Sequence, residues 1–250
     1  MPPEPSIPQS LPRDRPWTAG LRAARANVVP GLIVQALMFS ILMAYYFYPP
    51  TRGWLDGLAA VKARWGYGYS AINSAVAGAL IPELLRIFFF QRGRFRRSNL
   101  SNLLFTAPFW CVMGLAVDYF YRCQAGWFGG EATFAVVAKK VLVDQFLYNP
   151  LFACPVTTWL YDWKSHGFRA QGTEGFFTGE YYRDRVLPTL FATWGVWIPV
   201  MSILYSLPLM LQIPLGGLAL SMWVMLCTWM SEQHRAESIR GLAPSPPHCP

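Results

Sequence analysis

Long apolar runs, separated by short polar or basic segments, dominate the chain from residue 28 onward. The first run, 28–48, is 21 residues without a charge and ends in four consecutive aromatic residues. About 20 apolar residues suffice for a helix to span a bilayer, and aromatic residues concentrate at its interfaces. We therefore expect residues 28–48 to form a membrane-spanning helix.

Further apolar stretches lie at 67–90, 100–121 and 134–161, and residues 186–231 contain no charge at all. Those last 46 residues are long enough for two spans with a turn between Pro208 and Pro214. A broken or re-entrant segment fits the same pattern. The pattern predicts an all-α polytopic membrane helix bundle with about six apolar spans, in which 27–232 form a single transmembrane domain.

The segments between and beyond the apolar runs are polar. Residues 1–26 contain six prolines and four arginines, a composition typical of disorder, and 233–250 form a polar tail. We expect 49–66 and 162–185 to be loops. Small residues recur every four positions at Ser70, Ser74 and Gly78. Because small residues let helix backbones approach closely in lipid, this spacing predicts a helix-packing face.

Composition supports the same class of protein. Hydrophobic residues make up 54% of the chain, aromatic residues 16% and charged residues 14%, against about 25% charged in an ordinary soluble domain. These values exclude a disordered chain and disfavour a soluble enzyme. The net charge of +8 would suggest nucleic-acid binding in a soluble protein, but the basic residues lie beside apolar runs. Membrane topology and anionic lipid explain them more simply, and we expect no nucleic-acid partner.

The distribution of Lys and Arg predicts an orientation. If six spans alternate, fourteen basic residues fall on the side of the N-terminus and six on the other side. The positive-inside rule then places both termini inside. The densest basic run contains Arg92, Arg94, Arg96 and Arg97, and we expect it to anchor the loop to lipid headgroups.

Ionisable residues within the apolar stretches are the candidate site, because each is costly at the bilayer centre. Three acid–base couples have helical spacing, and polar residues extend the last of them: Glu83 with Arg86, Asp118 with Arg122, and Lys140 with Asp144, followed by Gln145 and Asn149. One interpretation is a polar seam that lines a pore. The other is that the basic members lie near helix ends and reach the interface, with no functional role.

Searches for catalytic and metal-binding patterns find nothing. The three histidines are far apart in loops or the tail, and the chain has no HExxH, GxSxG, Walker or GxGxxG motif. The five cysteines are scattered and show no CxxC spacing. We expect no enzyme activity, no metal and no cofactor.

The fourth apolar stretch and the C-terminal block carry a family resemblance. Lys140-x-x-x-Asp144-Gln145 followed by Pro150 resembles a segment of the Mpv-seventeen and peroxisomal-membrane-protein-twenty-two family. Leu207-Pro208 resembles that family's Val-Pro, and two tryptophans follow as they do there: Trp223 and Trp229. The resemblance covers roughly 67–232, so the chain looks like a divergent member with an extra N-terminal span.

The resemblance implies a membrane protein of mitochondria or peroxisomes with a channel-like role. Composition alone fits a bacterial inner membrane equally well. Our first hypothesis is a channel or pore for small solutes or ions, and the alternative is a structural or scaffold membrane protein without transport. The expected partner is the lipid bilayer, and homo-oligomerisation is left open.

Overall fold

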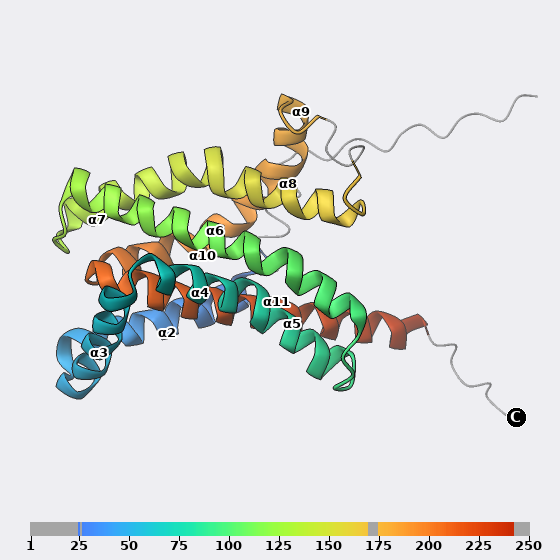
Figure 1. Ribbon diagram of the computed structural model, residues 1–250, viewed down its shortest axis with the longest axis horizontal. Coiled ribbons are helices and arrows are strands. Elements are labelled where there is room, and N and C mark those ends of the chain that lie inside the picture. The colour runs from blue at the N-terminus through green and yellow to red at the C-terminus, as the bar shows by residue number, and fades with distance from the viewer. Residues whose placement is uncertain (1–24, 26, 170–174, 243–250) are drawn as a thin grey trace, which may run out of the picture.

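The computed structural model describes residues 25, 27–169 and 175–242, with side chains described as far as residue 226. Its regular elements are all helices, and the described residues contain no strand. Figure 1 shows the helices running side by side along the long axis of the molecule. The predicted all-α bundle is therefore confirmed. Most of the segment 1–26 and residues 243–250, for which we expected disorder and a polar tail, lie outside the described residues.

Seven helices make up the described part of the chain, and π-helical turns interrupt several of them. They are α2 (Val28–Phe47), α3 (Pro49–Trp65), a helix built of α4 (Tyr67–Ala75), η1 (Val76–Leu80), α5 (Ile81–Leu85) and η2 (Arg86–Phe90), α6 (Arg97–Phe128), a helix built of α7 (Phe134–Val143), η3 (Asp144–Ala153) and α8 (Cys154–Ser165), a helix built of α9 (Gly179–Tyr181), η5 (Tyr182–Val186) and α10 (Leu187–Tyr205), and α11 (Leu209–Leu242).

Five helices are long and apolar enough to cross a membrane. They are Val28–Phe47, Tyr67–Phe90, Arg97–Phe128, Gly179–Tyr205 and Leu209–Leu226. Five of the about six expected apolar spans are thus confirmed as helices of this kind. The helix of α7, η3 and α8 has the length and runs alongside the others. It is not among the five, because Lys140, Asp144, Gln145 and Asn149 lower its hydropathy.

The structure corrects the prediction for one segment and decides between two alternatives for another. Residues 49–65 form helix α3 rather than a loop, because Leu55 and Ala59 pack one turn apart against the core. The stretch 186–231 is two helices and not a re-entrant segment. Its turn lies at 206–208, and α11 continues through Pro214 and on to Leu242, well into the polar tail.

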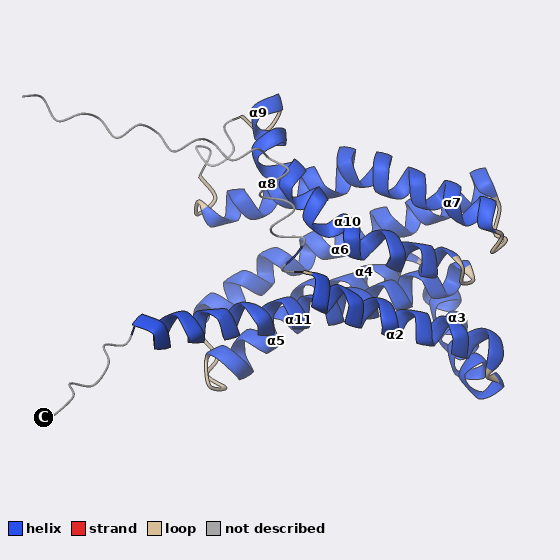
Figure 2. Ribbon diagram, turned by 180° about the vertical axis from the view of Figure 1, so that it is seen from behind, coloured by secondary structure: helices blue, strands red, loops and turns tan. Residues whose placement is uncertain are grey.

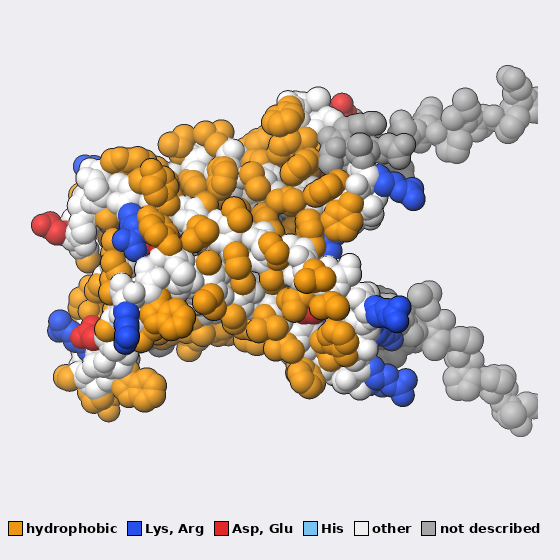
Figure 3. Space-filling model, viewed as in Figure 1, with side chains coloured by type: hydrophobic (Ala, Val, Ile, Leu, Met, Phe, Trp, Pro, Cys, Tyr) orange, Lys and Arg blue, Asp and Glu red, His pale blue; other side chains and the backbone are white. Residues whose placement is uncertain are grey.

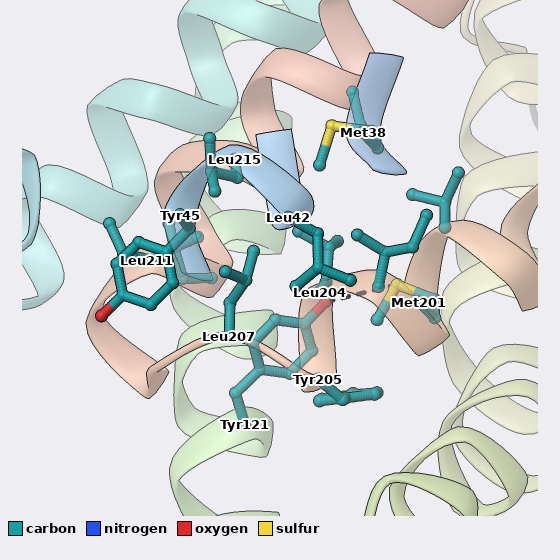
Figure 4. Close-up of a cluster of buried hydrophobic side chains, with 14 of the residues drawn as sticks. Met38, Leu42, Tyr45, Tyr121, Met201, Leu204, Tyr205, Leu207, Leu211 and Leu215 are labelled. Atoms are coloured by element: carbon teal, nitrogen blue, oxygen red, sulfur yellow. Dashed lines mark hydrogen bonds between the residues drawn. The ribbon is translucent and has the colours of Figure 1, made fainter. Parts of the chain in front are cut away.

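The core lies where α2, α10 and α11 meet. One face of α2 carries Val34, Met38 and Leu42 at four-residue intervals, and all three are buried. They pack with buried residues of α10 and α11, including Leu204 and Leu211, as Figure 4 shows. A bundle can bury hydrophobic side chains in its interior and also expose them on its outside when that outside contacts lipid.

The outer surface is apolar to an extent that only lipid contact explains. Large hydrophobic side chains cover the face shown in Figure 3, and several stand more than half exposed: Phe88, Phe89, Leu104, Val112 and Leu151. A soluble monomer rarely exposes such a contiguous apolar area. With its five apolar spans, the chain is an integral membrane protein.

The connections between helices lie at two opposite ends of the bundle. Figures 1 and 2 show α3, the α6–α7 connection and the α10–α11 turn at one end. The loop after α5 and the C-terminal end of α8 lie at the other end. Loop 91–96 and the described parts of 162–185 therefore share an end, opposite 49–66, as alternation requires when the helix of α7, η3 and α8 is counted as a sixth crossing.

The small residues of the second helix form the predicted packing face. A Cβ added to Gly78 would lie 2.3 Å from Trp110 of α6. A Cβ added to Gly114, also on α6, would lie 2.4 Å from the Ser70 carbonyl oxygen and 2.4 Å from the Ser74 hydroxyl. Real Cβ atoms essentially never come this close, so these two helices approach backbone to backbone.

Candidate functional site

The three buried acidic residues lie in three separate polar clusters. Glu83, Asp118 and Asp144 are 8%, 2% and 6% exposed, and each has its own set of hydrogen-bond partners. No hydrogen bond or ion pair joins one described cluster to another. The expected seam of mutually facing Glu83, Asp118, Lys140 and Asp144 is thus not continuous, and each cluster has a different consequence.

The Asp118 cluster ties α3 and α4 to α6. The Lys62 ammonium lies 2.7 Å from Asp118 Oδ2, and the Ser70 hydroxyl donates to the same oxygen at 2.7 Å. Arg122 contacts Oδ1 at 3.1 Å, which confirms the predicted couple. Lys62 also donates to the carbonyl of Gly66, so it fixes the end of α3 as well. All these partners lie within the protein, which marks the cluster as a structural tie.

The Glu83 cluster joins α5 to the start of α6. Asn99 donates to Glu83 Oε1 at 2.5 Å and Asn102 donates to Oε2 at 3.2 Å. Arg86 lies 3.9 Å from Oε2, with about half of its side chain exposed, so this predicted couple exists but is long. Asn99 Oδ1 also accepts from the Arg96 backbone N–H, which caps α6.

The Asp144 cluster lies where the helix of α7, η3 and α8 faces α10. The Tyr205 hydroxyl donates to Asp144 Oδ2, and the neighbouring Gln145 amide donates to Oδ1 at 3.1 Å. Tyr205 in turn accepts from Gln124 of α6 at 2.8 Å. Three helices therefore meet at one carboxylate, whose local backbone is π-helical from Asp144 to Ala153. Such turns are frequent at functional sites.

Lys140 does not pair with Asp144, so the predicted couple is wrong. Its ammonium lies 5.9 Å from the centroid of the Tyr205 ring, and no described carboxylate lies within ion-pair distance. The Asp144 oxygens accept hydrogen bonds from Tyr205 and Gln145 instead. Lys140 is 2% exposed and Asp144 is 6% exposed, so both side chains are buried near Tyr205 without pairing with each other.

A cavity of about 460 Å³ opens beside the Asp144 cluster, between α4, α6, the η3–α8 helix, α10 and α11. Asp144, Gln145, Asn149 and Trp223 of the predicted site line it, whereas Glu83, Arg86, Asp118 and Lys140 do not. Pro150 lies just outside it, and its carbonyl accepts from Tyr182. Most of the lining is apolar or aromatic, as in sites that bind small organic molecules.

Unpartnered polar atoms gather around this cavity. Among the described side chains, Gln145 Oε1, Gln212 Oε1 and the Tyr148 hydroxyl are buried without a hydrogen-bond partner, and all three residues line it. Native proteins leave few buried polar atoms unsatisfied, because each costs about 1–3 kcal/mol. An excess at one place indicates that something else satisfies them.

The remaining predicted residues lie at the edges of the molecule. Arg92, Arg94, Arg96 and Arg97 are all exposed at one end of the bundle, where headgroups would lie. Pro208 sits in the α10–α11 turn, and the side chain of Trp229 lies outside the described ones. The described residues contain no group of three metal-ligating side chains.

Sequence reasoning missed Lys62, Tyr205, Gln124 and Gln212. Lys62 and Gln124 fell outside the apolar runs, and Tyr205 and Gln212 lie inside the charge-free stretch 186–231. A polar residue inside a charge-free span, such as Gln212, was the one signal available. Three comparisons found no protein-family model, no curated protein and no solved structure that matches this chain.

Proposed function

We propose that this membrane protein is a channel or pore for small solutes or ions, and that the cavity beside Asp144 belongs to its path. The observation that carries the proposal is the cavity itself: about 460 Å³ of space inside a membrane bundle, with unpartnered polar atoms in its wall. Polar groups inside membrane helices are costly and commonly mark solute pathways.

The π-helical stretch that begins at Asp144 supports the same function. A π-helical stretch with Pro150 inside it frees backbone groups near the bilayer centre, which is tolerated where they face protein or a cavity. The resemblance to the Mpv-seventeen family points to a channel-like role as well, and membership in that family is part of the proposal.

The function is tested with purified protein in two systems. Single-channel recording in planar bilayers detects ion conduction, and swelling of proteoliposomes in glycerol or urea detects uncharged solutes. Gly216 lines the cavity, and the nearest atom to an added Cβ is Leu204 Cδ1 at 3.7 Å. Gly216→Phe should therefore fill the cavity and abolish flux. Gly126 has open space around it and is exposed, so Gly126→Phe is the matched control.

The alternative, a structural or scaffold protein, draws support from the Glu83 and Asp118 clusters. Their buried carboxylates are satisfied by internal partners and lie away from the cavity. A scaffold predicts no flux of ions, glycerol or urea above that of empty liposomes. Absence of flux in both systems from protein with a cooperative melt would reject the channel in favour of the scaffold.

A further inference from the structure

Among the described side chains, the buried lining atoms that lack a partner are the amide oxygens of Gln145 and Gln212 and the Tyr148 hydroxyl; all three can accept a hydrogen bond, and only the hydroxyl can also donate one. Gln145 uses its amide N–H to contact Asp144, and Gln212 uses its own to contact the Leu207 carbonyl at 3.0 Å. Both side chains are at least 97% buried, and both leave Oε1 without a partner. An amide oxygen can only accept a hydrogen bond. The two residues stand on different helices, η3 and α11, and both line the cavity.

The charge around the cavity is balanced. Asp144 is the one charged side chain among the described residues that line it. Tyr205 donates to that carboxylate, and the Lys140 ammonium lies 5.9 Å from the centroid of the same ring. The two opposite charges therefore lie near the same tyrosine, and each partly offsets the field of the other. An ion that enters the cavity loses the free energy of its hydration, and electrostatic attraction to the lining returns little of that free energy.

The rest of the wall is aromatic and apolar. Trp110, Trp197, Trp223 and Tyr148 come from four different helices and all line the cavity. Its volume of about 460 Å³ lies within the range of about 300–1,000 Å³ that is typical of small-molecule sites. Such walls bury flat or chain-like apolar bodies, while the two amide oxygens set the position of a polar end.

From these observations we infer that the cavity binds uncharged amphipathic molecules that donate hydrogen bonds, such as aromatic alcohols, and that Gln145 and Gln212 recognise the donor. This inference rests on the proposed function in one respect, since it names the class of solute that enters the same cavity. Binding itself needs no transport, so the two can fail separately. Replacement of both acceptors by apolar groups should remove the preference for a donor without removing the site.

The test compares two probes of nearly equal shape, 1-naphthol and 1-methylnaphthalene. Only the first carries a hydroxyl donor. Binding to the full chain in lipid nanodiscs is measured by equilibrium dialysis, and partition into empty nanodiscs is subtracted for each probe. We expect Gln145→Leu and Gln212→Leu each to weaken naphthol binding about tenfold, the worth of one hydrogen bond, and to leave methylnaphthalene binding within about twofold.

Two further variants keep the inference falsifiable if a glutamine variant does not fold. Gly216→Phe should weaken both probes at least tenfold, because it fills the space, whereas Gly126→Phe should change neither. The inference is overturned if folded glutamine variants lose both probes equally, or neither, because then no donor is read. It is overturned also if Gly216→Phe leaves naphthol binding intact, since the probe then binds elsewhere.

Flux measurements separate this inference from the proposed function. Glutamine-dependent naphthol binding in a protein without ion, glycerol or urea flux leaves the inference standing and rejects the pore. Flux that Gly216→Phe abolishes, together with binding that ignores the donor, rejects the inference alone. If the wild-type protein binds 1-naphthol and 1-methylnaphthalene equally well, the cavity accepts any apolar molecule, such as a lipid chain. This outcome also overturns the inference.

Discussion

Lys62 and Asp118 form a buried ion pair, with 2.7 Å between the ammonium and a carboxylate oxygen, although 56 residues separate them. Their side chains are only 1% and 3% exposed. The pair holds α3 against α6 at one end of the bundle. It therefore explains why a segment with little hydrophobicity, 49–65, has a fixed helical position.

Loss of Lys62 should destabilise the protein strongly. Lys62→Met leaves the Asp118 carboxylate buried with Ser70 and Arg122 as its remaining partners. We expect a loss of about 3 kcal/mol in the free energy of unfolding, the lower end for a broken buried pair, measured by melting in detergent. Arg52→Met is the control, because the Arg52–Asp56 pair is 3.9 Å long and exposed. It should change stability by less than about 0.5 kcal/mol.

The double variant Lys62→Met with Asp118→Leu separates a lost ion pair from lost packing. If the single variant fails because a charge is buried without its partner, removal of that charge should restore much of the stability. A double variant that melts as low as Lys62→Met would show that the aliphatic stem of Lys62, and not its charge, matters.

Gly114 should tolerate no side chain. Gly114→Ala would bring a Cβ to 2.4 Å from the Ser70 carbonyl and force α4 and α6 apart. Overpacking of this kind costs about 1–3 kcal/mol, which a melting curve detects. Gly126→Ala on the same helix meets no atom within 4 Å and should be neutral or slightly stabilising. Equal effects of the two changes would contradict close packing at Gly114.

The charges of Asp144 and Lys140 should have opposite effects on ion selectivity if the cavity lies on a conduction path. Asp144→Asn leaves Lys140 as the remaining charge near the cavity, and reversal potentials in planar bilayers should shift toward anions. Lys140→Met leaves Asp144 and should shift them toward cations. Two folded variants with the selectivity of the wild type would place conduction elsewhere.

The two ends of the bundle should face opposite sides of the membrane. Gly57→Cys in α3 and Phe177→Cys, at a position that is 97% exposed, report on the two ends in a cysteine-free background. A membrane-impermeant maleimide should label one of them in right-side-out vesicles and the other in inverted vesicles. By the positive-inside rule, position 177 should lie on the inner side. Labelling of both from the same side would contradict the arrangement of the helices.

The arginine run at 92–97 should bind anionic headgroups. All four arginines are exposed, and none forms an ion pair with a described residue. Replacement of the four by Gln should lower the affinity for phosphatidylglycerol by roughly 1 kcal/mol per residue, as measured by lipid retention in native mass spectrometry. Phosphatidylcholine retention is the control and should stay the same, as should solute flux. Altered solute selectivity would place the run in the path instead.

The sequence by itself determined the membrane class and most span positions. The first span, for example, was expected at 28–48 and lies at Val28–Phe47. The packing of Gly78 was also predictable, because helix spacing places small residues on one face. Hydropathy and helical periodicity are local properties, so a window of about 20 residues contains the information. The Arg122–Asp118 pair follows from the same local spacing.

Only the tertiary structure decided which partners the buried polar groups have. Lys62 reaches Asp118 across 56 residues, and Tyr205 reaches Asp144 across 61, so local spacing could not reveal either contact. Tyr205, and not Lys140, is the partner of Asp144, although helical spacing suggested the lysine. The cavity likewise arises from five helices that fail to fill the space between them. Voids and long-range contacts depend on how whole helices pack against one another, and the sequence of a single segment does not determine that packing.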